Sequence, residues 1–231
     1  MPSKKILITQ SNYIPWKGYF DAINMVDEFV LYDDMQYTKR DWRNRNKIKT
    51  AQGVQWLTIP VEVKGKYFQK INETNISDKE WNKTHWDTIR MNYSKALYFK
   101  DYKDFFEELY LSCEEESLSK INYHFLKGIC GLIGIRTSFR WSGEFDLRGD
   151  KSEKLLNICL DDGASEYFSG PAAKNYLDED LFAKNNIKVN WLDYTDYREY
   201  QQLNPPFEHG VSIIDLILNV GPELKTYMKT I

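Results

Sequence analysis

Two aspartates end an apolar run near the start of the chain, and they could take part in catalysis. Asp33 and Asp34 close the run that begins at Glu28. Adjacent residues of a strand point to opposite faces, so at most one of the two faces a given site, which argues against metal binding by the pair. An aspartate here can act as a base, orient an amine or bind a ribose. We take Asp34 as a candidate catalytic residue.

A cationic segment follows directly, with six Lys or Arg in eleven residues. These are Lys39, Arg40, Arg43, Arg45, Lys47 and Lys49, with Trp42 and Asn44 among them. Arginine forks match phosphate, and an indole can stack on a base. The net charge of the whole chain is −3, which does not favour a nucleic-acid surface. We expect Arg40, Arg43, Arg45 and Lys47 to bind a nucleotide diphosphate; the alternative ligand is a carrier protein, through its phosphopantetheine or acidic surface.

The first apolar run ends in a polar loop that opens a helix. The loop reads Gln10-Ser-Asn-Tyr-Ile-Pro-Trp-Lys-Gly-Tyr19, and exposed amides at a helix start favour an anion. The layout is similar to that of nucleotidyltransferases, but Trp16 and Tyr19 stand where their HxGH motif has histidines. We expect phosphate binding here rather than nucleotidyl transfer. Around it, we expect Tyr13, Trp16 and Trp42 to stack on sugar or base, and Gln10, Asn12, Gln36 and Asn44 to hydrogen-bond the ligand.

Two further residues extend the candidate site. His85 shares a helix face with Trp81 and is the second candidate catalytic base, because histidine titrates near neutral pH. A structural role for this histidine stays open. Ser169 ends a strand before Gly170-Pro171, where it can cap a helix or hold an anion or a sugar hydroxyl.

Composition narrows the class of protein. Aromatic residues make up 15% of the 231 residues, and Tyr and Trp suit sugar, base or peptide ligands as well as the core. The three cysteines make no metal-binding pattern, so we expect buried thiols and a reducing, cytoplasmic location. The apolar run that stops at Gln10 is too short for a signal peptide or a membrane span. Three histidines do not favour a metal centre.

These residues need a scaffold that brings strand ends together, and the alternation of elements predicts one. Expected strands lie at 5–10, 28–33, 137–141, 165–169 and 187–193, with helices between them. We expect one Rossmann-like α/β domain over 1–231 with a mainly parallel sheet, of the general kind seen in nucleotidyltransferases. An insertion over about 51–135 holds a β-hairpin, predicted at 55–63 and 67–76 around Lys64-Gly65, and several helices.

The chain resembles the WbqC-like protein family. The matching stretches run in order along nearly the whole chain: QSNYIPWKGYFD, DEFVLYDDMQYTKRDWRNRNKIKT, WLTIPV, the helix from Trp81 to His85, KSEKLLNIC, EYFSG and SIIDLILN. The resemblance implies a role in bacterial O-antigen or other polysaccharide biosynthesis. It also implies transfer of glycine or another aminoacyl group to an amino sugar.

From residues and resemblance together, we hypothesise a transferase that adds an acyl or aminoacyl group to the amino group of a nucleotide-linked sugar. The attacking amine loses a proton, so the site needs a base and an oxyanion donor. No cofactor is indicated beyond the group donor, which can be a carrier-protein thioester, a charged tRNA or an aminoacyl adenylate. The alternatives are a nucleotidyltransferase-like enzyme with a degenerate HxGH site and a non-catalytic nucleotide-sugar-binding protein. Neither stable nucleic-acid binding nor a fixed oligomeric state is predicted.

Overall fold

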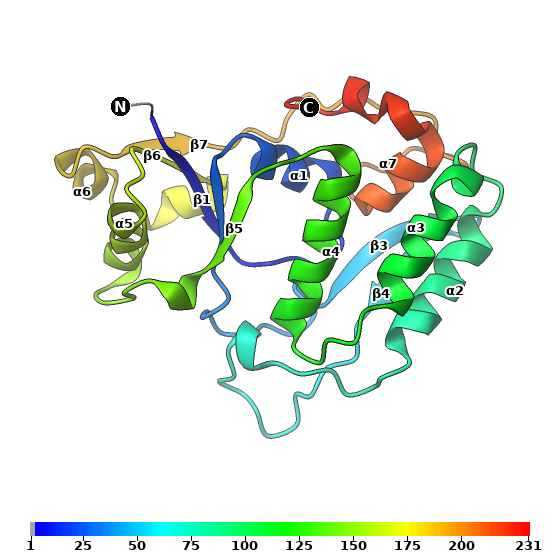
Figure 1. Cartoon of the computed structure of the whole chain (residues 1–231), viewed down its shortest axis with the longest axis horizontal. Coiled ribbons are helices and arrows are strands. Elements are labelled where there is room, and N and C mark those ends of the chain that lie inside the picture. Colours follow the sequence, from blue (N-terminus) through cyan, green and yellow to red (C-terminus); the bar gives the residue numbers. More distant parts are fainter. Residues whose placement is uncertain (1–2) are drawn as a thin grey trace.

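Five parallel strands form the central sheet (Figure 1) of the computed structural model, which describes residues 3–231. They are β1 (Lys5–Thr9), β2 (Glu28–Leu31), β5 (Ser138–Trp141), β6 (Glu166–Ser169) and β7 (Lys188–Trp191). The order across the sheet is β5-β2-β1-β6-β7, and every neighbouring pair is parallel. The chain steps outward from β1 in one direction and then returns to continue on its other side. The carboxyl ends of β1 and β6 therefore meet at the topological switch point, where ligands of open α/β sheets bind.

Helices cover both faces of the sheet. Ile6 and Ile8 of β1 pack under α5 (Lys151–Asp161) and α6 (Glu179–Lys184), whereas Leu7 faces α1 (Lys17–Asn24) and α4 (Leu118–Ile133). The same alternation continues in β2. Val30 belongs to the same hydrophobic cluster as Ile6 and Ile8, and Phe29 belongs to that of Leu7. Both faces are buried, which explains why the strands read as unbroken apolar runs.

The predicted fold class is confirmed: the chain is an α/β protein with a mainly parallel sheet, a hairpin and helices. Each of the five predicted strands is present, with its ends within two residues of the prediction. Between β2 and β5 the chain forms a hairpin and the helices α2 (Trp81–Tyr93), α3 (Phe99–Leu111) and α4. In Figure 1, α2 and α3 lie side by side on the far side of the hairpin from the sheet, close to α7 (Ile213–Val220).

The location of the hairpin was predicted wrongly. It pairs β3 (Arg45–Thr50) with β4 (Gly53–Thr58), and Gly53 has a φ of 109° at the turn, a value that favours glycine. The predicted second arm contains the 3₁₀ helix η1 (Ile71–Glu73), and within residues 3–231 a single β-bridge, between Val61 and Ile76, pairs the predicted arms. The cationic segment is therefore partly a strand. Its inward positions include Asn46 beside Ile48, and this polar residue hides the apolar alternation.

A buried carboxylate ties the helices near the hairpin to the last part of the chain. Asp215 of α7 accepts hydrogen bonds from the hydroxyls of Tyr93 (2.7 Å) and Tyr200 (2.7 Å) and from the amide of Gln202 (2.9 Å). The Tyr93 hydroxyl also accepts the backbone N–H of Lys49 in β3, at 2.9 Å. Burial raises the pKa of Asp215, while these donors act in the opposite direction. The network holds α2, α7 and the hairpin in one arrangement.

Replacing this carboxylate tests how much the network stabilises the fold. Asp215→Ala leaves Tyr93, Tyr200 and Gln202 without their buried acceptor, so we expect the free energy of unfolding to fall by about 3 kcal/mol. Urea denaturation measures the change. The control, Asp104→Ala, removes an exposed carboxylate of α3 and should alter stability by less than about 0.5 kcal/mol. Equal effects of the two substitutions would contradict a structural role for the network.

Candidate functional site

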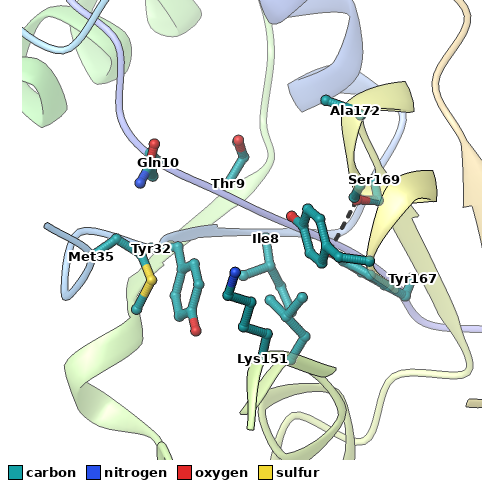
Figure 2. Close-up of a pocket in the computed structure, with 13 residues that line it drawn as sticks. Ile8, Thr9, Gln10, Tyr32, Met35, Lys151, Tyr167, Ser169 and Ala172 are labelled. Carbon is teal, nitrogen blue, oxygen red and sulfur yellow. Dashed lines mark hydrogen bonds between the residues drawn. The ribbon is translucent and has the colours of Figure 1, made fainter. Parts of the chain in front are cut away.

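A cavity of about 420 Å³ opens at the switch point between β1 and β6 (Figure 2). We call it the first cavity. It is lined by Ile8, Thr9, Gln10, Tyr32, Met35, Lys151, Leu155, Tyr167, Ser169, Gly170, Ala172, Ala173 and Tyr176. These residues come from the carboxyl ends of three neighbouring strands, from the start of α5 and from the 3₁₀ helix η3 (Pro171–Asn175). The sheet order thus creates the cavity.

Lys151 is the one charged side chain among the residues that line the first cavity. It is the first residue of α5, and the Asp150 carboxylate caps that helix by accepting the N–H groups of Ser152 (2.8 Å) and Glu153 (2.9 Å). Figure 2 shows its side chain reaching into the space between Tyr32 and Tyr167. The lining of the cavity therefore carries one positive charge, which can pair with an anionic ligand.

Two tyrosines of the first cavity, Tyr32 and Tyr167, keep their protons at neutral pH. Burial raises the pKa of Tyr32 to about 12, with a further contribution from the neighbouring Asp34 carboxylate. Burial also raises the pKa of Tyr167, whose hydroxyl donates to Ser169 Oγ at 3.1 Å. The phenols can thus donate hydrogen bonds and offer flat apolar faces, but neither is an anion that would repel phosphate.

A second cavity, of about 320 Å³, lies beside the same β1–α1 loop. It is lined by Asn12, Pro15, Trp16, Trp42, Asn46, His209 and Gly210. Gln10 lines the first cavity and Asn12 the second, so two loop residues that are close in sequence face different spaces. The loop positions both cavities.

Buried hydrogen bonds hold the β1–α1 loop in place. Asp33 accepts the backbone N–H of Ser11 at 2.8 Å and the hydroxyl of Ser119 from α4. The amide of Asn122 donates to Ser11 Oγ at 2.8 Å, and the Arg43 guanidinium donates to the Ser11 carbonyl at 3.3 Å. Burial raises the pKa of Asp33, whereas its hydrogen bonds and Arg43 lower it. The two aspartates have different partners, because Asp34 instead accepts from Ser142 at 2.8 Å. They lie in the turn after β2, which ends at Leu31, and not on the strand itself as predicted.

The cationic segment distributes its charges over internal contacts and the surface. The Arg43 guanidinium is largely buried near Asp41, 3.8 Å away, and holds the loop. The Arg45 guanidinium lies 4.1 Å from the centre of the Trp56 ring and donates to the Arg40 carbonyl. The Lys47 ammonium lies 5.2 Å from that ring and 5.8 Å from the ring of Trp42.

The predicted ligand-binding residues therefore separate into groups. Gln10 and Ser169 line the first cavity, and Asn12, Trp16 and Trp42 line the second. Arg40, Asn44 and Arg45 line a third, smaller cavity of about 210 Å³. Gln36 is exposed and donates to the Tyr67 carbonyl, whereas Tyr13 is fully buried.

His85 lies in the core rather than beside a cavity lined by strand ends. It is 5% exposed, its Nδ1 is 2.9 Å from the Tyr13 hydroxyl, and its Nε2 is 3.2 Å from the Thr58 carbonyl oxygen. Burial lowers its pKa to about 4. At neutral pH the imidazole is therefore uncharged with both nitrogens engaged. Asp34, the other predicted base, is partly buried. Tyr32 and Met35, which flank the two aspartates in the sequence, both line the first cavity.

Sequence reasoning did not select Lys151, Tyr32 or His209. Lys151 begins a helix that follows β5 by several residues, so its approach to β1 and β6 depends on how α5 packs on the sheet. Tyr32 follows β2 directly, and its position next to Asp33 was the available signal. His209 is far along the chain and reaches the second cavity through the loop before α7.

The positions of the HxGH motif hold side chains with other roles. Tyr19 is buried, and its hydroxyl donates to the Gln10 carbonyl at 2.8 Å, which fixes the end of β1. Trp16 packs against Tyr194 and Tyr197, with ring centres 5.5 and 5.1 Å apart. The buried Lys17 ammonium donates to the Arg198 carbonyl at 2.7 Å, and burial lowers its pKa to about 8. This turn supports the fold and one wall of the second cavity.

Comparison with known proteins places the chain in a family. A profile described as the WbqC-like protein family matches residues 10–227. The chain belongs to the WbqC-like protein family. The chain is also 50% identical over 226 residues to the uncharacterized protein Rv1507c of Mycobacterium tuberculosis, covering 98% of each chain. No solved structure matches significantly.

Membership of the WbqC-like family suggests a role related to polysaccharide biosynthesis. The matched range contains the β1–α1 loop, the cationic segment, Lys151 and His209. Within residues 3–231, no helix is long and apolar enough to cross a membrane.

The buried state of His85 predicts a pH dependence of stability. Its pKa is about 4 when folded and 6.5 ordinarily, so the unfolded chain takes up the proton first as pH falls. We expect this residue to lower the free energy of unfolding by about 3 kcal/mol between pH 6.5 and 4, at ~1.4 kcal/mol per pKa unit.

Urea denaturation of the protein and of His85→Gln across this pH range isolates the effect, because the carboxylates that also titrate are common to both. The decline should be shallower in the variant. Parallel curves would show that the pKa of His85 is the same in the folded and unfolded chain and would contradict its assignment as a neutral core residue.

Proposed function

We propose that this WbqC-like protein is a transferase that adds an acyl or aminoacyl group, with glycyl as one candidate, to the amino group of a nucleotide-linked sugar used for surface-polysaccharide synthesis. The proposal rests first on the first cavity, which lies at the switch point of the sheet and carries one lysine among neutral side chains. Family membership supports the pathway.

The first cavity suits the nucleotide part of such a ligand. The Lys151 ammonium would pair with a phosphate, and the rings of Tyr32, Tyr167 and Tyr176 offer faces for a base or ribose. Thr9, Gln10 and Ser169 supply uncharged hydrogen-bonding groups at the strand ends. A few polar groups that fix orientation within a mainly apolar wall are typical of small-molecule sites.

The transfer itself needs a group that accepts the proton of the attacking amine. We propose Asp34 for this role rather than His85. Asp34 is partly buried, and its neighbours in the sequence Tyr32 and Met35 line the first cavity, although Ser142, Lys70 and Asn72 contact its carboxylate. Both nitrogens of His85 are engaged in the core, and its low pKa makes it a weak base. The carbonyl of the donor, an acyl or aminoacyl group, then joins the sugar nitrogen as the donor's carrier group leaves.

Nucleotidyl transfer is less well supported as the function. The residues at the histidine positions of the HxGH motif are an indole and a buried phenol, and neither carries the positive charge that would stabilise a transferred phosphate. In our proposal, a nucleotide in the first cavity serves only to bind the substrate, and its phosphate bonds stay intact.

A lysine substitution tests the nucleotide site. Lys151→Ala removes the charge that would pair with phosphate, so we expect the Kd for UDP or dTDP, whichever binds, to rise about tenfold. Isothermal titration measures the affinity. The matched control is Lys184→Ala on α6, which removes an exposed lysine that lines none of the three cavities described above. Equal affinity in both variants, or no nucleotide binding by the unmodified protein, would contradict the assignment.

The reaction is tested by mass spectrometry. A nucleotide-linked amino sugar is incubated with the protein and, in separate reactions, with a carrier-protein thioester, glycyl-tRNA, or glycine with ATP and a synthetase. A mass gain equal to one acyl or glycyl group identifies donor and acceptor together, and Asp34→Asn should reduce its rate at least about hundredfold. Release of pyrophosphate by this protein alone with ATP would favour nucleotidyl transfer instead.

A further inference from the structure

The second cavity has a lining that the proposed nucleotide site does not use. Two indoles, from Trp16 and Trp42, contribute its apolar surface, together with Pro15. Its polar lining comes from two carboxamides and the exposed imidazole of His209. No carboxylate, ammonium or guanidinium lines it. Such a lining suits a ligand with an apolar face and a rim of uncharged hydrogen-bonding groups.

Neighbouring aromatic rings hold both indoles in place. Trp16 packs edge-on against Tyr194 and Tyr197, as described above, and the ring centre of Trp42 lies 5.3 Å from that of Trp56 on β4. Trp42 nevertheless remains 39% exposed. An exposed tryptophan braced in this way is a rigid platform, and a rigid platform loses little conformational entropy when a ligand stacks on it.

One carboxamide in the second cavity lacks a partner. The amide group of Asn46 is fully used: its nitrogen donates to the carbonyls of Tyr13 and Ile14, each at 3.0 Å, and its oxygen accepts the N–H of Lys47 at 2.7 Å. In contrast, the buried Oδ1 of Asn12 accepts no hydrogen bond from any residue between 3 and 231. A buried acceptor without a donor is costly, so a ligand O–H or N–H group that reaches this oxygen would stabilise the complex.

Positive charge lies next to this cavity without lining it. The Lys47 ammonium is 5.8 Å from the centre of the Trp42 ring, and Arg45 stacks on Trp56 behind it. An anionic substituent on the ligand, such as an anomeric phosphate, would be attracted toward this side.

We infer that the second cavity is a carbohydrate subsite, in which a pyranose ring stacks on Trp42 and donates a hydroxyl or amide hydrogen to Asn12 Oδ1. A pyranose has C–H faces that match an indole and a rim of O–H and N–H donors. An alkyl chain has no such donor, and a free phosphate has no apolar face. The inference extends the proposed function, since it assigns the sugar part of the ligand to a place separate from the nucleotide part.

The ring can come from two sources. It can be the sugar of the nucleotide-linked ligand itself, because Gln10 and Asn12 face the two cavities and their Cα atoms are at most about 7 Å apart. It can also belong to a separate glycan. In the first case, the nucleotide-linked sugar binds more tightly than the nucleotide alone, and Trp42→Ala removes the difference. In the second case, a methyl glycoside binds equally well with UDP present or absent, and neither ligand raises the affinity of the protein for the other.

Equilibrium binding of free sugars tests the subsite without any need for catalysis. The probes are methyl glycosides of glucosamine, galactosamine and their N-acetyl derivatives, together with N-acetylglucosamine 1-phosphate. We expect one of them to bind with a millimolar Kd, and Trp42→Ala to weaken that binding about tenfold. The matched control is Phe68→Ala, which removes an aromatic ring that is 86% exposed and does not line the cavity.

Asn12 provides a second pair of variants. Asn12→Ala removes the unpaired acceptor and should weaken sugar binding at least about fivefold, whereas Asn12→Asp keeps an acceptor and should retain binding. Thermal melting identifies any variant that fails to fold. Saturation-transfer NMR on the unmodified protein requires no variant: ring C–H protons of a bound sugar should receive magnetisation from the aromatic side chains.

The inference is overturned if none of the probes binds up to about 50 mM, a range well beyond that of specific weak ligands. It is equally overturned if Trp42→Ala and Phe68→Ala bind alike, or if a nucleoside displaces the sugar from the cavity while Lys151→Ala has no effect on nucleotide affinity. The proposed function fails by different observations, namely loss of nucleotide binding in the first cavity and absence of a mass gain. Sugar binding by a protein without transferase activity would leave the subsite established.

Discussion

The carboxylate of Asp33 fixes the loop on which both cavities depend. It accepts the backbone N–H of Ser11 from one side and the hydroxyl of Ser119 from the other. It thereby links the end of β2, the β1–α1 loop and helix α4. The loop continues from there with Gln10 on the side of the first cavity and Asn12 on the side of the second. A shift of this one carboxylate would move the walls of both cavities together.

Burial makes this arrangement costly for the charge of Asp33, and the raised pKa records that cost. The hydrogen bonds to the carboxylate and the nearby guanidinium of Arg43 offset part of it. A buried charge of this kind adds little net stability compared with an apolar core, but its loss leaves several donors unpaired. Its main effect is geometric. Few positions of the loop backbone allow Ser11 and Ser119 to donate to Asp33 while Arg43 donates to the Ser11 carbonyl.

The strands and the order of elements followed from sequence because both faces of the sheet are buried. A strand such as Glu28–Leu31 reads as an apolar run whatever its neighbours, so local pattern was sufficient. The hairpin did not follow, because Asn46 occupies an inward position by bonding the carbonyls of Tyr13 and Ile14, which are distant in sequence. Lys151 escaped prediction for a similar reason. Its place in the first cavity depends on the packing of α5 on the sheet and on no local motif.

The cationic segment shows why local charge is a poor guide to an anion site. The Arg43 guanidinium donates to the Ser11 carbonyl and pairs with Asp41, and Arg45 stacks on Trp56. These contacts place the charges around the hairpin instead of concentrating them in one cavity. Lys151, by contrast, is the one charged residue in the lining of the first cavity. Its side chain is exposed and has no carboxylate partner among the residues that line this cavity, so it is free to pair with an anionic ligand there. The electrostatic argument for the nucleotide therefore rests on Lys151, and the aromatic platform beside the cationic segment is left to bind the sugar ring.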